Sequence, residues 1–307
     1  MIRRGTDSDL SLQVRHGKEI HDHGTDSDML AFIHMPKAAG TTLANILRRN
    51  FGRRHFDTRF FSDRPVFGAA DYHRVRWVYP ELKSIAGHGV TGTSDLETAV
   101  PDIRHFTFVR EPIARLLSQY EFNWNCLTED ERKRWTPDAY FEEVILTEFA
   151  NVQSRMLAGD GGAERAIEFL NRSNAFIGMT ESYAESLILF REWSGVAELD
   201  IRYRSVNETI SNGDSIRYQI KQRLARDSDL RDRVNCAVDQ DRAVYEFACQ
   251  RYQDQKSSYG QTLGQDLERF LQSNRDTSHI ADDQLTSQLY RNLVYKPLRR
   301  WIFSKAA

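Results

Sequence analysis

Residues 30–43 read LAFIHMPKAAGTTL, and they give the clearest indication of the fold class. The run from Leu30 to Met35 is mostly apolar and short, which is typical of a buried strand. Residues 41–50 then repeat apolar side chains at the spacing of one helix face. Pro36 and Gly40 separate the two segments. A strand, a glycine-containing loop and a helix in this order indicate the start of a parallel α/β sheet.

The loop between this strand and this helix has the residues of an anion-binding site. A helix N-terminus offers backbone N–H groups without partners in the helix, together with the positive end of the helix dipole. Gly40 lets the backbone approach an anion closely, and Lys37 supplies a mobile positive charge. Thr41 and Thr42 either cap the helix or donate hydroxyl hydrogen bonds to the anion. The alternative is structural: Thr41 caps the helix and Lys37 is a solvated loop charge.

The spacing in this loop differs from that of a nucleoside-triphosphate P-loop. In that motif the lysine directly follows the second glycine, whereas Lys37 precedes Gly40 by three positions. The sequence also shows no clear acidic partner for magnesium after a later strand. The loop therefore suits a phosphosulfate better than a metal-bound triphosphate, and we expect no metal. A kinase that acts on a small molecule stays open as an alternative.

Strands and helices alternate along the rest of the chain. Short apolar runs predict strands at 84–87, 105–110, 175–179 and 201–206. Helices are predicted from Pro112 onward, in the middle of the chain over 137–171, around 187–190, and over 228–253. This alternation predicts an α/β fold in which helices cover both faces of a mostly parallel sheet.

A second anion site is expected where the strand at 105–110 ends. Arg110 stands at the carboxyl end of that strand, where ligands bind in open α/β sheets. Ser118 lies within the first two turns of the following helix, so its hydroxyl can reach the same anion. Arg115 either contributes or pairs with Glu111, four residues earlier. For Arg110 a structural salt bridge is the alternative to a ligand contact.

Net charge and cysteine content exclude several classes of protein. The 307 residues carry a net charge of -2, so no global basic field draws the chain to nucleic acid. The 3 cysteines are an odd number without close pairs, which argues against a disulfide framework and against a structural zinc site. A reducing compartment fits best.

The two anion sites and the residues between them resemble carbohydrate sulfotransferases that use 3'-phosphoadenosine-5'-phosphosulfate (PAPS). The resemblance is to the family that includes heparan sulfate and uronyl 2-O-sulfotransferases and bacterial relatives. Residues 34–43 resemble its 5'-phosphosulfate loop, and 108–120 resemble its 3'-phosphate motif. Ala86-Gly87-His88 matches the Gly-His that carries the proposed base of the family. Further similar segments follow in family order at 151–157, 176–181, 204–209 and 241–248.

This resemblance implies a P-loop-NTPase-like three-layer fold and transfer of a sulfuryl group from PAPS to a hydroxyl, which we expect to be that of a carbohydrate. It implies that His88 is the base and that Lys37 stabilises charge on the oxygens around sulfur. Donor-binding residues are expected to be Pro36, Lys37, Ala38, Ala39, Gly40, Thr41, Thr42, Arg110, Ser118 and Arg217. Relatives often have threonine or serine where this chain has Ala38-Ala39, so one hydroxyl donor is missing. A module of the same fold that binds the product PAP or a glycan without turnover is the main alternative.

We expect three parts in the chain. Residues 1–29 are polar, lack a signal peptide or membrane anchor, and are interpreted as a flexible arm. Residues 30–255 form the sulfotransferase domain, and 256–307 form a helical extension. The basic and apolar segment 289–303 either touches an anionic surface or a partner, or packs back on the domain. The missing anchor and the cysteine content together suggest a cytoplasmic protein; the oligomeric state stays open.

The acceptor site is the least defined part of the prediction. Aromatic side chains between 122 and 140 either stack on a sugar ring or belong to the core; they are Phe122, Trp124, Trp135 and Tyr140. The stretch 53–76 is locally basic and either receives an acidic glycan or is a solvated loop. Its arginines are Arg53, Arg54, Arg59, Arg64, Arg74 and Arg76.

Overall fold

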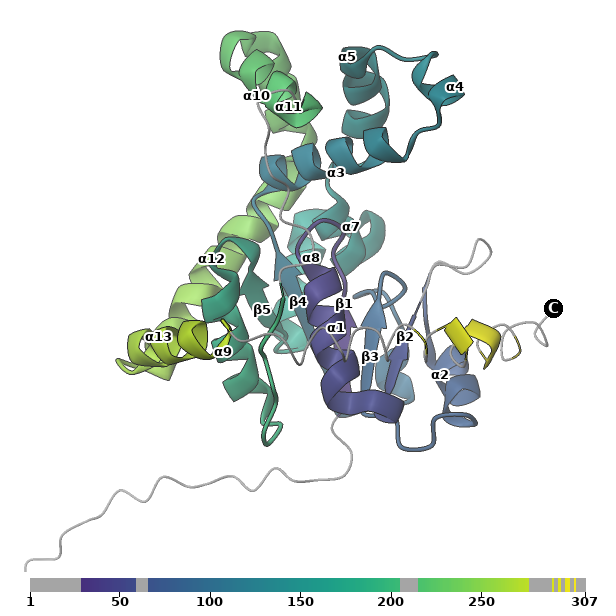
Figure 1. Cartoon of the computed structure of the whole chain (residues 1–307), viewed down its shortest axis with the longest axis vertical. Coiled ribbons are helices and arrows are strands. Elements are labelled where there is room, and N and C mark those ends of the chain that lie inside the picture. The colour runs from purple at the N-terminus through teal and green to yellow at the C-terminus, as the bar shows by residue number, and fades with distance from the viewer. Residues whose placement is uncertain are drawn as a thin grey trace, which may run out of the picture.

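The computed structural model describes residues 29–58, 66–204 and 215–275, together with 289, 292, 293, 296–298 and 301. Its body is a sheet of five parallel strands with helices on both faces (Figure 1), as expected for an α/β fold. The strand order is β2-β3-β1-β4-β5. The strands are β1 (Met29–Ile33), β2 (His55–Asp57), β3 (Ser84–Gly87), β4 (Ile103–Val109) and β5 (Phe176–Met179).

The α-helices follow the strands in an alternating order along the chain. They are α1 (Gly40–Phe51), α2 (Ala69–Arg76), α3 (Pro112–Cys126), α4 (Glu129–Arg132), α5 (Pro137–Tyr140), α6 (Leu146–Glu148), α7 (Val152–Ala158), α8 (Gly162–Arg172), α9 (Tyr183–Ser194), α10 (Ile216–Arg226), α11 (Ser228–Ala237), α12 (Asp239–Tyr259) and α13 (Leu263–Ser273). A π-helical segment spans Phe141–Ile145, and 3₁₀ turns span Gly52–Arg54, Leu96–Thr98, Gly159–Gly161 and Thr180–Ser182. No helix of these described segments is long and apolar enough to cross a membrane.

The centre of the sheet is closed by apolar side chains on both faces, as expected for parallel strands that are covered by helices. Every residue of β1 is buried. Aromatic rings stack from strand to helix: Phe32 and Phe106 have centroids 5.1 Å apart, and Phe106 and Phe190 have centroids 4.6 Å apart. This packing holds the central strands, and therefore the residues at their ends, in fixed positions.

All five strands are parallel, so their carboxyl ends meet at one edge of the sheet, which we call the carboxyl edge. β1 lies in the middle, with β3 on one side and β4 on the other. The chain therefore changes direction across the sheet at β1, and ligands of open α/β sheets bind at such a switch point. The residues that directly follow the five strands are His34, Thr58, His88, Arg110 and Thr180.

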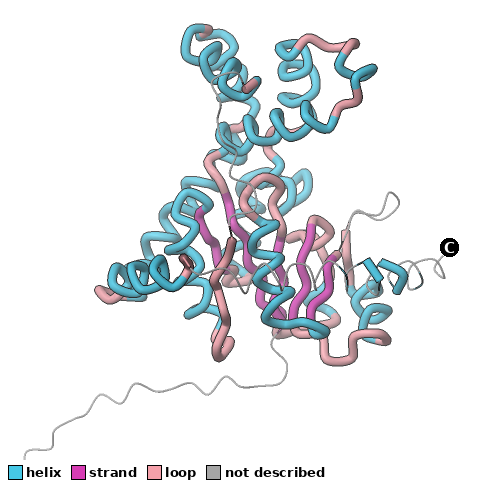
Figure 2. Tube along the Cα trace, in the orientation of Figure 1, coloured by secondary structure: helices cyan, strands magenta, loops and turns pink. Residues whose placement is uncertain are grey.

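A helical lobe lies beyond the carboxyl edge, at the top of Figure 1. It contains α3, α5, the π-helical segment, α10 and α11, and Figure 2 shows it as helices joined by loops. The lobe has a hydrophobic core of its own; this core includes Leu116, Leu117, Tyr120, Phe141, Leu230 and Val234. Helix α12 runs from the lobe to the body (Figure 1). The lobe is thereby held over the edge where ligands are expected.

Two sequence-based predictions of secondary structure are wrong. Residues 201–204 form no strand, while 205 and 206 lie outside the described residues. Side-chain oxygens bind the backbone of this segment instead: the N–H of Arg202 donates to Asp200 at 3.0 Å and that of Tyr203 donates to Asn274 at 2.7 Å. The helix expected over 228–253 is interrupted at Val238, where α11 has ended and α12 has not begun. The short strand β2 was not predicted at all.

The two ends of the chain lie largely outside the described residues. Of the expected N-terminal arm, only Met29 is described, and it belongs to β1. The expected boundary after residue 255 falls inside α12, and Leu263 and Phe270 of α13 are buried in the core of the body. The proposed surface contact through 289–303 stays a prediction, since few of these residues are described; Leu289, Leu293 and Trp301 among them are exposed.

Candidate active site

The loop between β1 and α1 contains two residues with left-handed backbone. Lys37 has φ 64° and Ala39 has φ 59°. Such conformations cost free energy in residues other than glycine, and they cluster at functional sites. Ala39 is the N-cap of α1 and makes no side-chain cap hydrogen bond. Thr41 therefore does not cap the helix, which contradicts that part of the structural alternative. The N–H of Thr42 donates to the carbonyl of Ala39 at 3.2 Å, and no side-chain cap competes with a ligand for the other N–H groups at the helix start.

Gly40 is required by a close approach of its backbone to His34. A Cβ atom at position 40 would lie 2.0 Å from Cδ2 of His34. The His34 ring stacks on Phe32 with centroids 5.3 Å apart, so it has little room to withdraw. Burial, together with the nearby His88, lowers the pKa of His34 to about 3. His34 is thus a neutral packed side chain beneath the loop.

His88 follows β3 at the carboxyl edge and lies beside His34. Its Nδ1 donates to the backbone carbonyl of His34 at 2.7 Å, and the two ring centroids are 4.3 Å apart. Gly87 before it has φ 145°, and a Cβ there would lie 2.3 Å from the carbonyl oxygen of Thr58. Burial lowers the pKa of His88, and the bond to His34 opposes this in part. A neutral ring that is protonated on Nδ1 has its lone pair on Nε2, where it can accept a proton.

Lys37 and Arg110 lie together at the carboxyl edge, and Arg217 of α10 is near enough to affect the pKa of both. Nη1 of Arg110 donates to the carbonyl of Lys37 at 3.1 Å, which ties the two expected anion sites together. Burial first, and then Arg110, lower the pKa of Lys37; Glu121 opposes this, and Arg217 adds a smaller lowering. Burial and then Arg217 lower the pKa of Arg110, while Glu181 and Glu111 oppose this. An anion placed between the cations would relieve their mutual repulsion, so the group fits a negatively charged ligand.

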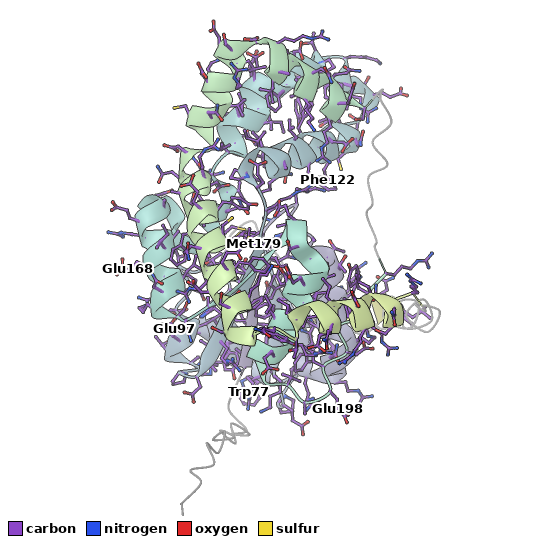
Figure 3. The ribbon with its side chains drawn as sticks, turned by 90° about the vertical axis from the view of Figure 1, so that its left-hand side faces the viewer. Trp77, Glu97, Phe122, Glu168, Met179 and Glu198 are labelled. Atoms are coloured by element: carbon purple, nitrogen blue, oxygen red, sulfur yellow. The ribbon has the colours of Figure 1, made fainter. Side chains whose placement is uncertain are left out.

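The ammonium of Lys37 lies 4.2 Å from the ring centroid of Phe122, a residue of α3. Phe122 is 51% exposed, and Figure 3 shows it at the underside of the lobe, facing the body. The other aromatic candidates pack in the lobe instead: Trp124 and Trp135 lie 5.7 and 5.8 Å from Tyr140, measured between centroids. The structure therefore separates Phe122, which is at the site, from three residues that belong to the packing of the lobe.

Ser118 and Arg115 lie on the same helix but in different surroundings. Ser118 is 8% exposed on α3. Arg115 is fully buried, lies 3.6 Å from Asp241 and donates to the carbonyl of Phe149. Both expectations for Arg115 are wrong, because burial leaves it no surface for a ligand and its ion-pair partner is Asp241. Glu111 instead caps α3 by accepting from the N–H groups of residues 113 and 114 at 3.0 and 2.6 Å.

The described arginines of the basic stretch 53–76 lie away from this site. Arg53 and Arg54 directly precede β2, so they lie at the amino edge of the sheet, opposite the cations. Arg74 and Arg76 end α2, and the neighbouring Trp77 is at the end of the molecule far from Phe122 (Figure 3). Arg59, Arg64 and residues 211–214 of the loop before Arg217 lie outside the described residues. The described arginines thus give no support to a glycan site in this stretch.

Sequence reasoning missed the role of Gln153. Its side chain pairs with both backbone groups of Arg110, at 2.9 Å in each case. A buried amide leaves no periodicity or composition signal, and its position in a similar segment of the family was the clue available. Among the described residues, no group of three or more acidic, histidine or cysteine side chains gathers as metal ligands would. The expectation of no metal stays a prediction.

One comparison with known proteins finds a match. A family model described as "Sulfotransferase family" matches residues 24–291, which is most of the chain and includes every residue of the site. No curated protein matches the chain.

Proposed function

Because the chain belongs to the sulfotransferase family, we propose that it transfers the sulfuryl group of PAPS to a hydroxyl of a carbohydrate. The observation that carries this proposal is the contact of Arg110 with the carbonyl of Lys37 at the carboxyl edge, beside a helix N-terminus without a side-chain cap and with Arg217 near enough to affect the pKa of both cations. PAPS has two anionic parts, and its 5'-phosphosulfate can bind at Lys37 while its 3'-phosphate binds at Arg110. The residues present therefore fit PAPS.

Donor binding divides between two segments of the chain. The loop 36–42, with Lys37 and the N–H groups of the first turn of α1, holds the 5'-phosphosulfate. Arg110, with Ser118 and Arg217, holds the 3'-phosphate. Each hydrogen bond to a charged group contributes about 1.5–3 kcal/mol, so Arg110 distinguishes PAPS from an adenylate that lacks the 3'-phosphate.

His88 acts as the base in the transfer. The acceptor hydroxyl forms a bond to sulfur, the bond between sulfur and the bridging phosphate oxygen breaks, and the hydroxyl proton passes to Nε2 of His88. The lowered pKa of His88 keeps the ring neutral near pH 7 and thus able to accept that proton. Lys37 stabilises the negative charge that develops on the bridging oxygen. The leaving product is adenosine 3',5'-bisphosphate (PAP).

A carbohydrate acceptor is favoured by the position of Phe122. The ring is half exposed and contacts Lys37, so a group that stacks on it lies next to the sulfuryl group. Aromatic faces of this kind suit the apolar face of a sugar ring, while the adjacent cation suits its hydroxyls.

A cytoplasmic location is part of the same proposal. Cys126, Cys236 and Cys249 are all free thiols, and free thiols persist in reducing compartments. Fractionation of the source cells tests this, and recovery outside the cytoplasm would contradict it.

The test of function is a sulfation assay with radiolabelled PAPS and a panel of glycans, run beside binding of PAP. Labelled product with the wild-type chain and its loss in Lys37→Ala support the enzyme. Binding of PAP without product from any acceptor supports the inert module. Binding of ATP only in the presence of magnesium, with none of PAP, overturns the proposal in favour of a kinase.

A further inference from the structure

A buried polar network lies directly behind Arg110. It consists of Arg115 of α3, Gln153 and Ser154 of α7, and Asp241 of α12. Their exposed fractions are 0% for Arg115, Gln153 and Asp241 and 1% for Ser154. Hydrogen bonds join Gln153, Ser154 and Asp241 and fix their positions, whereas Nε and Nη1 of Arg115 have no hydrogen-bond partner among the described residues.

Gln153 completes the end of strand β4. Its Oε1 accepts from the N–H of Arg110 and its Nε2 donates to the carbonyl of Arg110, each at 2.9 Å. Arg110 comes one residue after Val109, the last residue of β4, which is paired with Met179 of β5. The amide thus takes the place of one more strand residue and satisfies both backbone groups. An amide is suited to this because it both donates and accepts.

Gln153 is itself held at its backbone. The carboxylate of Asp241 accepts from the N–H of Gln153 at 3.2 Å and from that of Ser154 at 2.8 Å. In return Oδ1 of Asn151, which is left-handed with φ 53°, accepts from the N–H of Asp241 at 3.0 Å. The guanidinium of Arg115, 3.6 Å away, balances the buried carboxylate. The backbone from which the side chain of Gln153 extends is therefore fixed in place.

The guanidinium of Arg110 depends on this arrangement for its direction. Its hydrogen bond within the protein runs from Nη1 to the carbonyl of Lys37. The backbone from which that side chain extends is set by Gln153. Loosening the backbone would shift the guanidinium relative to Lys37 while leaving both cations in the site.

We propose that Gln153 is the positioning residue that makes this site selective for a donor with a 3'-phosphate, acting through Arg110. The inference rests on the proposed function, in which Arg110 binds that phosphate. It predicts a loss of selectivity between PAP and AMP, which differ in the 3'-phosphate, rather than a general loss of nucleotide binding.

The test compares Kd values for PAP and AMP by calorimetry in the full chain. Gln153→Met removes both bonds to Arg110, and Gln153→Glu keeps the acceptor but loses the donor. Ser186→Ala is the matched control, because the buried Ser186 hydroxyl pairs in the same way with both backbone groups of Met179, at the end of β5. Thermal unfolding of each variant reports the structural cost.

We expect PAP to bind about 10- to 100-fold more weakly to Gln153→Met, as for a lost hydrogen bond to a charged group. AMP should bind within about twofold of the wild type on the same basis, since no contact of its own is lost. Ser186→Ala should keep the preference for PAP despite a lower Tm. If Gln153→Met does not fold, Gln153→Glu decides the question.

Three results would overturn the inference in distinguishable ways. A preference for PAP that both Gln153 variants retain removes Gln153 from selectivity and leaves the proposed function intact. An equal loss in Ser186→Ala shows that any loosening of a strand end has this effect. A wild-type chain that binds PAP no better than AMP overturns the proposed function, and this inference with it.

Discussion

Substitution of Gly40 by alanine tests the geometry of the anion loop most sharply. The new Cβ would lie 2.0 Å from Cδ2 of His34, whereas carbon atoms in contact are about 3.5–4.0 Å apart. The imidazole would have to move by about 1.5 Å or more. It is held between Phe32, at 5.3 Å, and His88, at 4.3 Å between centroids. The substitution therefore overpacks the contact between the first turn of α1 and the half-buried ring of His34.

Overpacking of this kind costs about 1–3 kcal/mol, which lowers the Tm by roughly 2–10 °C for a domain of this size. The matched control is Gly264→Ala in α13, because a Cβ there meets nothing within 4 Å. Alanine is favoured over glycine in a helix by about 0.5–1 kcal/mol, so Gly264→Ala should raise the Tm slightly. Two Gly→Ala changes in one chain are thus expected to have opposite signs.

Differential scanning calorimetry of both variants measures these shifts. A double-mutant cycle with His34→Ala identifies the cause, because removal of the imidazole should abolish most of the cost of Gly40→Ala. A Gly40→Ala chain as stable as the wild type would refute the close approach. A cost that persists undiminished in the His34→Ala background would refute His34 as its source.

Three further predictions concern the base, the pH dependence and the buried ion pair. His88→Ala should lower kcat by about 10²–10⁴-fold while the Kd for PAP stays near that of the wild type; unchanged turnover in a sulfation assay would exclude His88 as the base. His34 has a pKa of about 3 in the folded chain and about 6.5 when unfolded, so the unfolded chain binds more protons between these values. The contribution of His34 to the free energy of unfolding should therefore fall as the pH drops from about 6.5 toward 3. Urea unfolding at pH 7 and at pH 5 should show a smaller loss of this free energy in His34→Ala than in the wild type. An equal loss in the two chains would contradict this. Asp241→Asn leaves the buried Arg115 without its ion-pair partner and should cost about 3–5 kcal/mol in urea unfolding; a cost below about 1 kcal/mol, typical of an exposed pair, would show that the pair does not matter.

The start of the fold could be predicted because its signals are local. An apolar run, the break at Pro36 and Gly40, and the helical spacing after them are enough to identify β1 and α1. Arg110 and His88 directly follow strands, so a parallel sheet brings them to one edge whatever the details of packing. The helix after Glu111 could also be predicted from local sequence, because Pro112 suits the first turn of a helix.

What could not be predicted depends on contacts between distant residues. The segment 201–204 has strand-like residues, but its backbone is bonded to side chains instead of to a neighbouring strand: Arg49 donates to the carbonyl of Arg202, and Asn274 accepts from the N–H of Tyr203. The interruption at Val238 places Asp241 at the start of α12, where its N–H meets Asn151. The sequence around Asp241 does not indicate that Asn151, 90 residues away, is its partner. The pairing of Arg115 with Asp241 could not be predicted for the same reason.

The electrostatic proximity of Arg217 to Lys37 and Arg110 also comes from tertiary structure. A basic residue in the first turn of a helix is most often solvated, so only the resemblance to the family made Arg217 a candidate for the donor site. The lobe brings α10 over the carboxyl edge, so that Arg217 affects the pKa of both other cations. Its assignment to the donor site stays a prediction, and the geometry supplies the reason to test it.

Calorimetric titration of the wild-type chain and of Arg110→Ala with PAP, AMP and magnesium-ATP tests the donor site most directly. If Arg110 binds the 3'-phosphate, PAP binds to the wild type at least about tenfold more tightly than AMP does, as one bond to a charged group requires. Arg110→Ala should then remove most of that difference, and magnesium-ATP should bind no better than AMP. Equal affinity for PAP and AMP, or a preference for magnesium-ATP, would show that the site is not built for PAPS.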